Sequence, residues 1–368
     1  MNENILLKNE EKAVFALRSL YVKYGYLPYK MSKFEEYDLY VRNKDFLVSD
    51  SVITFNDTNG RLLALKPDVT LSIIKNSRED VAYKNKLCYN ENVYRISDST
   101  HSFKEIMQTG IECIGEVDIN DIFEVVYLAA KSLDTVSSNF ILDISHVGVF
   151  CSCIDSISDS KSFKKEITKL VSEKNTHGIK SLCKDYAISE ENTDLLVSFV
   201  SLYGDVDSTL EKLSKILPKN VDSASFNSLT KLCSLLSKTE FKDRIRIDFS
   251  VINDMKYYNG FVFRGFLNGI SEGVLSGGEY GNLLRRMGKS GDAIGFAIYM
   301  DLLSALEESS SEYDVDVLLV YDTATDAETL FEYKNKIIES GKSVSCQNGV
   351  TDKISYKELI DIRGNKND

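Results

Sequence analysis

Four segments of the chain contain polar or aromatic side chains in patterns that suit the binding of a small ligand. LALKPDVT (63–70) lies at a predicted strand-to-helix corner, and NVYRISDSTHSFKEIMQTGIE (92–112) has the pattern of a β-hairpin. DMKYYNGFVF (254–263) places paired tyrosines before a strand, and SGGEYGNL (276–283) supplies a Gly-Gly turn and one more tyrosine. The candidate ligand-binding residues in these segments are Asp68, Thr70, Arg95, Gln108, Glu112, Tyr257, Tyr258 and Tyr280.

The predicted hairpin carries Arg95 on its incoming strand and two hydrogen-bonding side chains on its outgoing strand. Gln108 and Glu112 are an even number of residues apart, so both face one side of the sheet. The turn between the strands, SDSTHS, holds almost none of the charge that a grip on an anion requires.

If the four segments converge, they form a pocket for a small cationic or aromatic metabolite, such as an amino acid. Carboxylates and the Gln108 carbonyl accept hydrogen bonds from an ammonium group or an imidazole N–H. Tyrosines supply a flat apolar wall with a polar tip. No Ser or Cys occurs in a nucleophile-elbow pattern, which argues against a hydrolase.

Each of these residues also has a purely structural interpretation. Asp68 is suited to the start of a helix, Glu112 to an exposed strand position, and Arg95 to a surface ion pair. Tyr257 and Tyr258 favour strands by propensity, and the Gly-Gly pair is typical of a turn. Only the order in which the four segments occur together favours a binding site over these structural interpretations.

Composition limits the classes of function. The chain has 368 residues, 43% of them hydrophobic and 27% charged, with a net charge of −12, which disfavours nucleic acid as a partner. We expect a cytoplasmic protein, because no apolar run is long enough for a membrane span and the first residues lack a signal-peptide pattern. Seven cysteines without a C-x-x-C pair and three histidines predict no metal site, and we expect no cofactor.

The elements that position the four segments are predicted from periodicity and turn residues. Residues 8–25 predict a helix that ends at a glycine, and residues 51–66 predict a hairpin with an Asn-Gly turn. A helix is expected to start at Pro67-Asp68. The stretch 292–308 predicts a strand that becomes a helix after Ala297.

The chain divides into a strand-rich core at 1–310 and a tail at 313–368, with a short polar linker at 309–312. Residues 155–240 predict successive amphipathic helices with solvated Lys and Glu faces, inserted between the strand-rich halves. The tail predicts a small β-α-β unit. Antiparallel hairpins interrupted by helices indicate an α+β fold rather than a doubly wound sheet.

The ordered set of motifs resembles the catalytic core of histidyl-tRNA synthetase, over roughly residues 8–306. The resemblance rests on K-P-D-V-T (66–70), Y-R-I-S (94–97), Q-T-G-I-E (108–112), N-D-M-K-Y-Y (253–258), G-G-E-Y-G-N-L (277–283) and G-F-A-I-Y-M-D-L (295–302). It implies a class II synthetase-like antiparallel sheet flanked by helices. It also implies that the tail is a truncated relative of the anticodon-binding domain.

The departures from that family concern the handling of ATP. The positions of the family's motif 2 Glu and motif 3 Arg are held by Ser97 and Leu302, and that of its R-G-L-D-Y-Y Arg by Asn253. The motif 2 loop keeps Lys104 alone of its basic residues. Because adenylation needs cations on the triphosphate, we expect no aminoacylation. Asn253 also leaves open whether free histidine binds the pocket, since the family's Arg lies near the ligand carboxylate.

The chain also resembles the family of regulatory subunits of ATP phosphoribosyltransferase, which carry H-V-G and L-Y-G motifs around the insertion. Here these are HVG at 146–148 and LYG at 202–204. The resemblance implies a non-catalytic subunit of histidine biosynthesis that dimerises and joins a short-form catalytic subunit in a hetero-octamer. It further implies that the subunit activates its partner and mediates feedback inhibition by histidine, as an allosteric effector.

Two other functions remain open from the residues alone. A divergent histidyl-tRNA synthetase would need Lys104 and Arg95 to hold ATP, with help from Arg285 or Arg286. A synthetase-like amino-acid-binding protein would use the same pocket for another ligand.

Overall fold

The computed structural model describes residues 9–44, 52–77, 83–97, 100–218, 222–252, 257–306 and 313–364. The chain forms two compact units, of which the larger spans Glu10–Ala305 and the smaller contains Leu306–Asp368. The predicted linker at 309–312 and the candidate position Asn253 lie outside the described residues.

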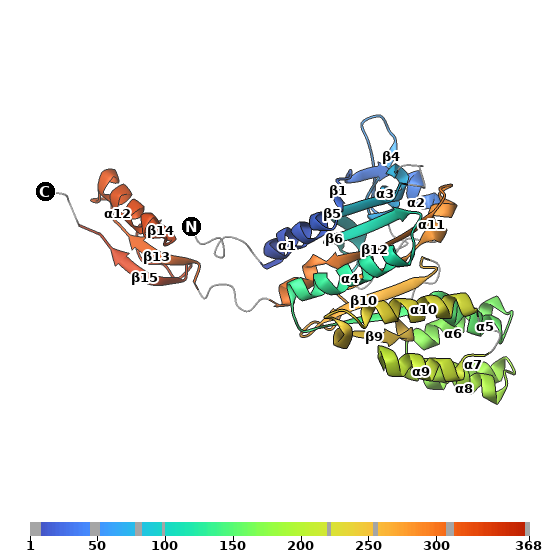
Figure 1. Cartoon of the computed structure of the whole chain (residues 1–368). Coiled ribbons are helices and arrows are strands. Elements are labelled where there is room, and N and C mark those ends of the chain that lie inside the picture. Colours follow the sequence, from blue (N-terminus) through green and yellow to red (C-terminus); the bar gives the residue numbers. More distant parts are fainter. Residues whose placement is uncertain are drawn as a thin grey trace. The chain divides into compact units, whose positions relative to one another are not determined.

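A nine-stranded mixed sheet is the centre of the larger unit (Figure 1). Its pairs are antiparallel except for two parallel pairs, β1 with β5 and β7 with β9. In spatial order the strands are β1 (Leu27–Pro28), β5 (Asn85–Ile96), β6 (Phe103–Gly115), β12 (Asp292–Tyr299), β11 (Leu275–Glu279), β10 (Phe261–Leu267), β7 (Phe140–His146), β9 (Ile245–Asp248) and β8 (Tyr203–Asp205).

Helices α1 (Asn9–Lys23) and α4 (Ile119–Val136) cover one face of this sheet. Tyr21 of α1 packs edge-on against Phe296 of β12, and its hydroxyl is 3.0 Å from the Ser132 hydroxyl of α4. Leu133 of α4 packs against Gly265 of β10, where a Cβ atom would lie 2.6 Å from its Cδ1 atom. The two helices therefore bury one face of the sheet. The opposite face is left for the candidate ligand-binding residues.

Shorter elements border the opposite face, which carries Gln108 and Glu112. A three-stranded antiparallel sheet and three helices share a buried apolar cluster there. These elements are β2 (Phe34–Glu36), β3 (Thr54–Asn56), β4 (Leu62–Leu65), α2 (Tyr37–Arg42), α3 (Thr70–Asn76) and α11 (Gly281–Arg286). The predicted Asn-Gly hairpin is β3–β4, and Gly60 in its turn has φ = 78°.

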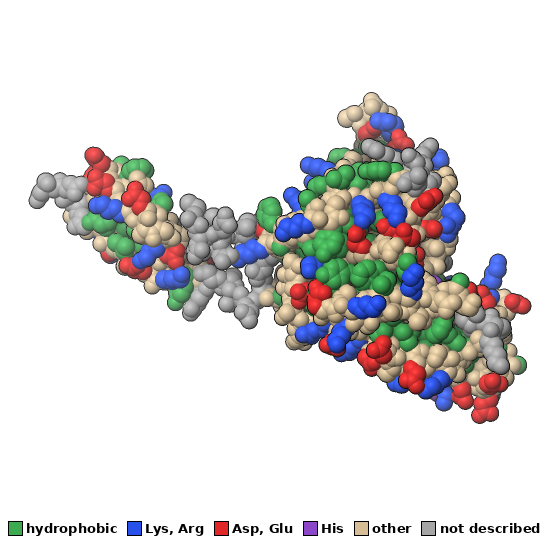
Figure 2. Space-filling view, viewed as in Figure 1, with side chains coloured by type: hydrophobic (Ala, Val, Ile, Leu, Met, Phe, Trp, Pro, Cys, Tyr) green, Lys and Arg blue, Asp and Glu red, His purple; other side chains and the backbone are tan. Residues whose placement is uncertain are grey.

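The predicted helical insertion follows β7 and α5 (Val147–Asp155). Each of its five helices begins at a Ser, Asn or Asp whose side chain accepts a hydrogen bond from a first-turn N–H, so each start is specified locally. Acidic and basic side chains are interspersed over its outer surface (Figure 2). The helices are α6 (Lys161–Ser172), α7 (Thr176–Asp185), α8 (Glu190–Ser201), α9 (Val206–Ile216) and α10 (Ser223–Leu236).

Three predictions for the larger unit were wrong in detail. The Gly277-Gly278 pair is no turn but part of β11, and the strand predicted to end at Ala297 continues to Tyr299. A 3₁₀ helix, η5 (Met300–Leu306), then replaces the expected α-helix. Helix α3 starts at Thr70 rather than at Pro67. Two more 3₁₀ helices, η3 (Lys242–Arg244) and η4 (Phe249–Val251), flank β9.

The smaller unit contains β13 (Val315–Val320), α12 (Ala327–Glu339), β14 (Val344–Gln347) and β15 (Tyr356–Asp361). The strands form a parallel sheet in the order β14-β13-β15. The predicted β-α-β unit is therefore present, but the prediction did not include the third strand, β15. That strand escaped prediction because YKELID is mostly exposed at the sheet edge and shows no apolar run.

Candidate functional site

The structure places all eight candidate side chains around one cavity, which we call the central cavity. It has a volume of about 200 Å³ and lies on the sheet face opposite α1 and α4. The eight are Asp68, Thr70, Arg95, Gln108, Glu112, Tyr257, Tyr258 and Tyr280. They come from α3 and the residues before it, from the β5–β6 hairpin, and from the segments that flank β10 and β11.

The β6 strand positions Gln108 and Glu112 by the alternation of its side chains. Glu112 is the cross-strand neighbour of Gly295 on β12, where a Cβ atom would lie 1.8 Å from the Glu112 Oε2 atom. Gly110, between the two acceptors, would bring a Cβ atom within 2.6 Å of the Tyr89 hydroxyl. Glycines at these points keep the floor of the cavity open.

Glu112 lies at the floor of the cavity and is 2% exposed. The Thr70 hydroxyl donates a hydrogen bond to its Oε1 atom at 3.0 Å, and the Tyr280 hydroxyl donates to its Oε2 atom. Burial outweighs these donors and raises the pKa of Glu112 to about 8. An N–H donor or a cation on a ligand would favour the ionised form of this carboxyl.

Asp68 combines its two candidate roles. Its Oδ1 atom accepts a hydrogen bond from the Leu71 N–H at 2.9 Å, which closes the first turn of α3, and its side chain also lines the cavity. Burial raises the pKa of Asp68, although the nearby Arg95 opposes the shift.

Arg95 is oriented by the backbone rather than by a carboxylate. Its Nε atom donates to the Pro67 carbonyl at 3.1 Å, which ties the hairpin to the corner that carries Asp68. Gln108 is 4% exposed, and its side-chain amide makes no hydrogen bond to another described residue. Because Gln108 lines the cavity, its amide has hydrogen-bonding capacity left for a ligand.

The tyrosines form one wall. The rings of Tyr257 and Tyr258 meet edge-on at 4.8 Å, and Tyr280 lies 6.0 Å from Tyr257. Burial raises the pKa of all three hydroxyls well above its usual value, so each phenol stays neutral at physiological pH. The described lining therefore offers carboxyls, an amide, phenols and a single cation, Arg95.

Sequence reasoning missed three polar residues that also line the central cavity: Tyr89, Ser276 and Tyr299. Tyr299 follows Gly295 and Ala297 at the two-residue period of β12. That alternation would have identified it if the strand had not been ended at Ala297.

Two cations considered for ATP lie elsewhere. Arg285, on α11, pairs with Asp292 at 3.2 Å and is half exposed. Lys104 is an exposed residue at the start of β6, opposite Arg95. Neither residue lines the central cavity.

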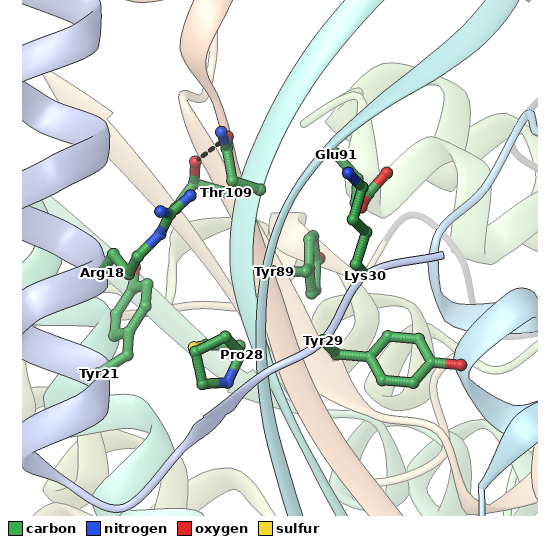
Figure 3. Close-up of a pocket in the computed structure, with 10 residues that line it drawn as sticks. Arg18, Tyr21, Pro28, Tyr29, Lys30, Tyr89, Glu91 and Thr109 are labelled. Carbon is green, nitrogen blue, oxygen red and sulfur yellow. Dashed lines mark hydrogen bonds between the residues drawn. The ribbon is translucent and has the colours of Figure 1, made fainter. Parts of the chain in front are cut away.

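A second hollow, the sheet-edge cavity, lies between α1 and the β5–β6 hairpin and has a volume of about 380 Å³. Figure 3 shows Arg18 and Tyr21 extending from α1 toward the strands, with Tyr29 and Lys30 on the facing segment. Its lining comes from distant segments with no shared motif, so no sequence pattern predicted it. Tyr89 lines this cavity as well as the central one.

The part of the chain that the structure describes has no helix long and apolar enough to cross a membrane. Its His, Cys, Asp and Glu side chains form no group of three or more that suits a metal ion.

Comparison with known proteins identifies the family of this fold. The family model described as histidyl-tRNA synthetase matches residues 6–303. The ATP phosphoribosyltransferase regulatory subunit of Clostridium kluyveri is 28% identical over 335 residues, which cover 88% of this chain and 85% of that protein.

Two solved structures show the same fold. One is described as an ATP phosphoribosyltransferase regulatory subunit/histidyl-tRNA synthetase from Bacillus halodurans; it is 24% identical, with a TM-score of 0.79 over 97% of this chain and 94% of that one. The other belongs to an ATP phosphoribosyl transferase (HisG:HisZ) complex from Thermotoga maritima, 20% identical, with a TM-score of 0.63 over 79% and 97% of the two chains. The predicted class II synthetase-like α+β fold is confirmed, with a mixed rather than purely antiparallel sheet.

Proposed function

The chain belongs to the histidyl-tRNA synthetase family, and we propose that within it the protein is a regulatory subunit of ATP phosphoribosyltransferase rather than a synthetase. Curated relatives with this name align over most of the chain. In this proposal the protein performs no aminoacylation, activates a short-form catalytic subunit in the first step of histidine biosynthesis, and transmits inhibition by histidine.

The composition of the central cavity is the observation that carries the proposal. Its described lining contains two carboxyls, Asp68 and Glu112, against one cation, Arg95, whose Nε atom is already bonded to a carbonyl. In adenylation the amino-acid carboxylate attacks the α-phosphorus of ATP and pyrophosphate leaves, so negative charge develops on the phosphates, which a synthetase stabilises with several cations. This lining instead suits the ammonium group and imidazole of histidine, which need acceptors and flat walls.

The partners follow from the same proposal. We expect the protein to dimerise and to bind the catalytic subunit in a hetero-octamer in the cytoplasm. Histidine would bind the central cavity and shift the complex between states of different activity, because an effector acts only through its different affinity for those states. The smaller unit is proposed to be a truncated relative of an anticodon-binding domain.

The test measures two activities of the purified protein. We expect no histidine-dependent exchange of pyrophosphate into ATP, and a several-fold rise in the activity of a short-form catalytic subunit when this protein is added. Histidine should lower that activity. Unaided charging of tRNA with histidine would refute the proposal.

A calorimetric titration separates histidine from other ligands of the cavity. Glu112→Gln should weaken histidine binding by roughly tenfold or more, because it removes a charge-assisted hydrogen bond. Glu116→Gln, an exposed residue just beyond β6, is the matched control and should bind as the wild type does. Tighter binding of another amino acid than of histidine would point to a different effector.

A further inference from the structure

A third hollow, the insertion cavity, lies where the helical insertion meets the sheet and has a volume of about 340 Å³. Its floor is formed by β7 and β10, and its rim by the end of α6, by β8 and by η4. It shares a sheet face with the central cavity. Ser276, which lines the central cavity, is the cross-strand neighbour of Arg264 on β10, and Arg264 is the neighbour of Asp143 on β7.

Asp143 is a buried carboxyl without a partner. It is 6% exposed, and its Oδ1 atom accepts no hydrogen bond from any described residue. Burial and the nearby Asp248 raise the pKa of Asp143 to about 7, although Arg246 and Lys174 oppose the shift. A buried polar group that stays unpaired destabilises the fold, which calls for an explanation beyond packing.

Arg264 is the second group without a charged partner. It stands beside Asp143 in the strand register, yet no ion pair joins it to a residue in the described ranges. Its guanidinium instead lies 5.5 Å from the ring centroid of Phe266. Asp143 and Arg264 thus line the same cavity as cross-strand neighbours without forming an ion pair with each other.

The other charges of the cavity are already matched. Lys174 donates to the Asp248 Oδ2 atom at 2.8 Å and lies 4.7 Å from the ring centroid of Tyr203, while Asp248 Oδ1 accepts from the Ser250 N–H. Arg246 donates to the Tyr203 hydroxyl. These pairs fix the rim and leave Asp143 and Arg264 as the groups with unused bonding capacity.

We propose that the insertion cavity binds a free α-amino acid, whose ammonium group pairs with Asp143 and whose carboxylate pairs with Arg264. A lone cation would leave Arg264 unmatched, and a lone anion would leave Asp143 unmatched. An α-amino acid carries both charges on one carbon atom, which suits two opposite groups that line one cavity as cross-strand neighbours. The side chain would lie against Phe266 and Ile141, the apolar part of the lining. This site is distinct from the central cavity, and the inference does not rest on the proposed function.

The experiment screens the proteinogenic L-amino acids one at a time by thermal unfolding of the full chain, followed by calorimetric titration. The variants are Asp143→Asn and Arg264→Gln in the insertion cavity, with Glu112→Gln in the central cavity as the reference. We expect at least one amino acid to stabilise the wild type and Glu112→Gln alike. Its affinity should fall roughly tenfold or more in each insertion-cavity variant.

Single-charge probes and the unliganded variants complete the test. Ethylamine and acetate should bind far more weakly than the amino acid, and Asp143→Asn should fold at least as stably as the wild type, since it removes an unpaired buried carboxyl. The inference is overturned if no amino acid meets these criteria, or if every amino-acid signal disappears in Glu112→Gln and persists in the other two variants. Binding of acetate as tight as that of any amino acid overturns it as well.

Discussion

Glu112 is a carboxyl group enclosed by Thr70 and Tyr280 at the floor of the central cavity. Its raised pKa means that ionisation is less favourable in the folded chain than in the unfolded chain. Buried carboxyl groups with such raised pKa values destabilise the fold, and they are more typical of binding sites than of packed cores.

The stability of the unliganded protein should therefore depend on pH. With a folded pKa of about 8 against an ordinary 4.5, the protonated carboxyl favours folding at low pH, and this contribution is lost as the pH rises from 4.5 through 8. The loss amounts to about 3–5 kcal/mol in the free energy of unfolding. Asp68, Asp143 and Glu279 have pKa values shifted in the same direction.

Urea denaturation across this pH range checks the prediction. Glu112→Gln should flatten the decline in unfolding free energy, whereas Glu116→Gln should keep the slope of the wild type. An unchanged slope in Glu112→Gln would show that the carboxyl is ionised at little cost in the folded state.

Lys66, next to Pro67, is a fully buried lysine whose Nζ atom donates to Glu91 on β5 at 2.8 Å. Glu91 also accepts from the Met31 N–H at 3.3 Å. Glu91→Ala should destabilise the protein by about 3–5 kcal/mol, because it leaves a buried ammonium unpaired. Glu105→Ala, an exposed position on the adjoining strand, should cost less than about 1 kcal/mol, and the two unfolding free energies provide the comparison.

At the scale of elements, β11 depends on having no side chain at Gly277 and Gly278. A Cβ atom at Gly278 would lie 2.5 Å from the Phe261 carbonyl and 2.6 Å from the Tyr258 ring. The backbone of β11 can thus pack against the tyrosine wall only if position 278 is a glycine.

Gly278→Ala should destabilise the protein by about 1–3 kcal/mol and should weaken ligand binding, since Tyr258 must move. Gly60→Ala is the control, because its added methyl meets nothing within 4 Å and costs about 1–2 kcal/mol for the left-handed backbone alone. Both variants are compared by denaturation and by histidine titration. Normal binding by Gly278→Ala would mean that the wall tolerates the shift.

The same glycines show where prediction of elements from the sequence fails. Locally a Gly-Gly pair favours a turn, and only the close approach of Phe263 and Gly295, distant in sequence, makes it a strand. The β3–β4 hairpin was predictable because its determinant, the Asn-Gly turn at 59–60, is local.

The site was predictable in part for a related reason. Alternation along β6 indicated that Gln108 and Glu112 share a face, and they do. Their meeting with Asp68 and Tyr280 depends on the register of the sheet, which no local pattern contains; it was anticipated from the order of motifs in a known family. The placement of Asp143 beside Arg264 depends on the same register and was not anticipated.

At the scale of the molecule, the two units differ greatly in core size. In the described part of the smaller unit, the buried apolar cluster is built on Val317, Leu319, Ile337 and Ile362. Small cores bury a smaller fraction of their surface and are correspondingly marginal.

Calorimetry of the full chain should therefore show two unfolding transitions, the smaller unit melting first. A variant that ends at residue 306 should lose the first transition and keep the midpoint of the second. A single transition, or a shifted second midpoint, would show that the units stabilise one another.

The tyrosine wall has a practical consequence for spectroscopy. The chain contains no tryptophan. Tyrosine absorption is therefore not masked by a stronger absorber, and tyrosine fluorescence is not quenched by energy transfer to tryptophan. Tyr257, Tyr258 and Tyr280 are rigidly held in ring contact beside a carboxyl, an asymmetric arrangement that gives intense near-ultraviolet circular dichroism. Occupancy of the central cavity is thus expected to be visible in the unlabelled protein, through the optical activity of its own chromophores.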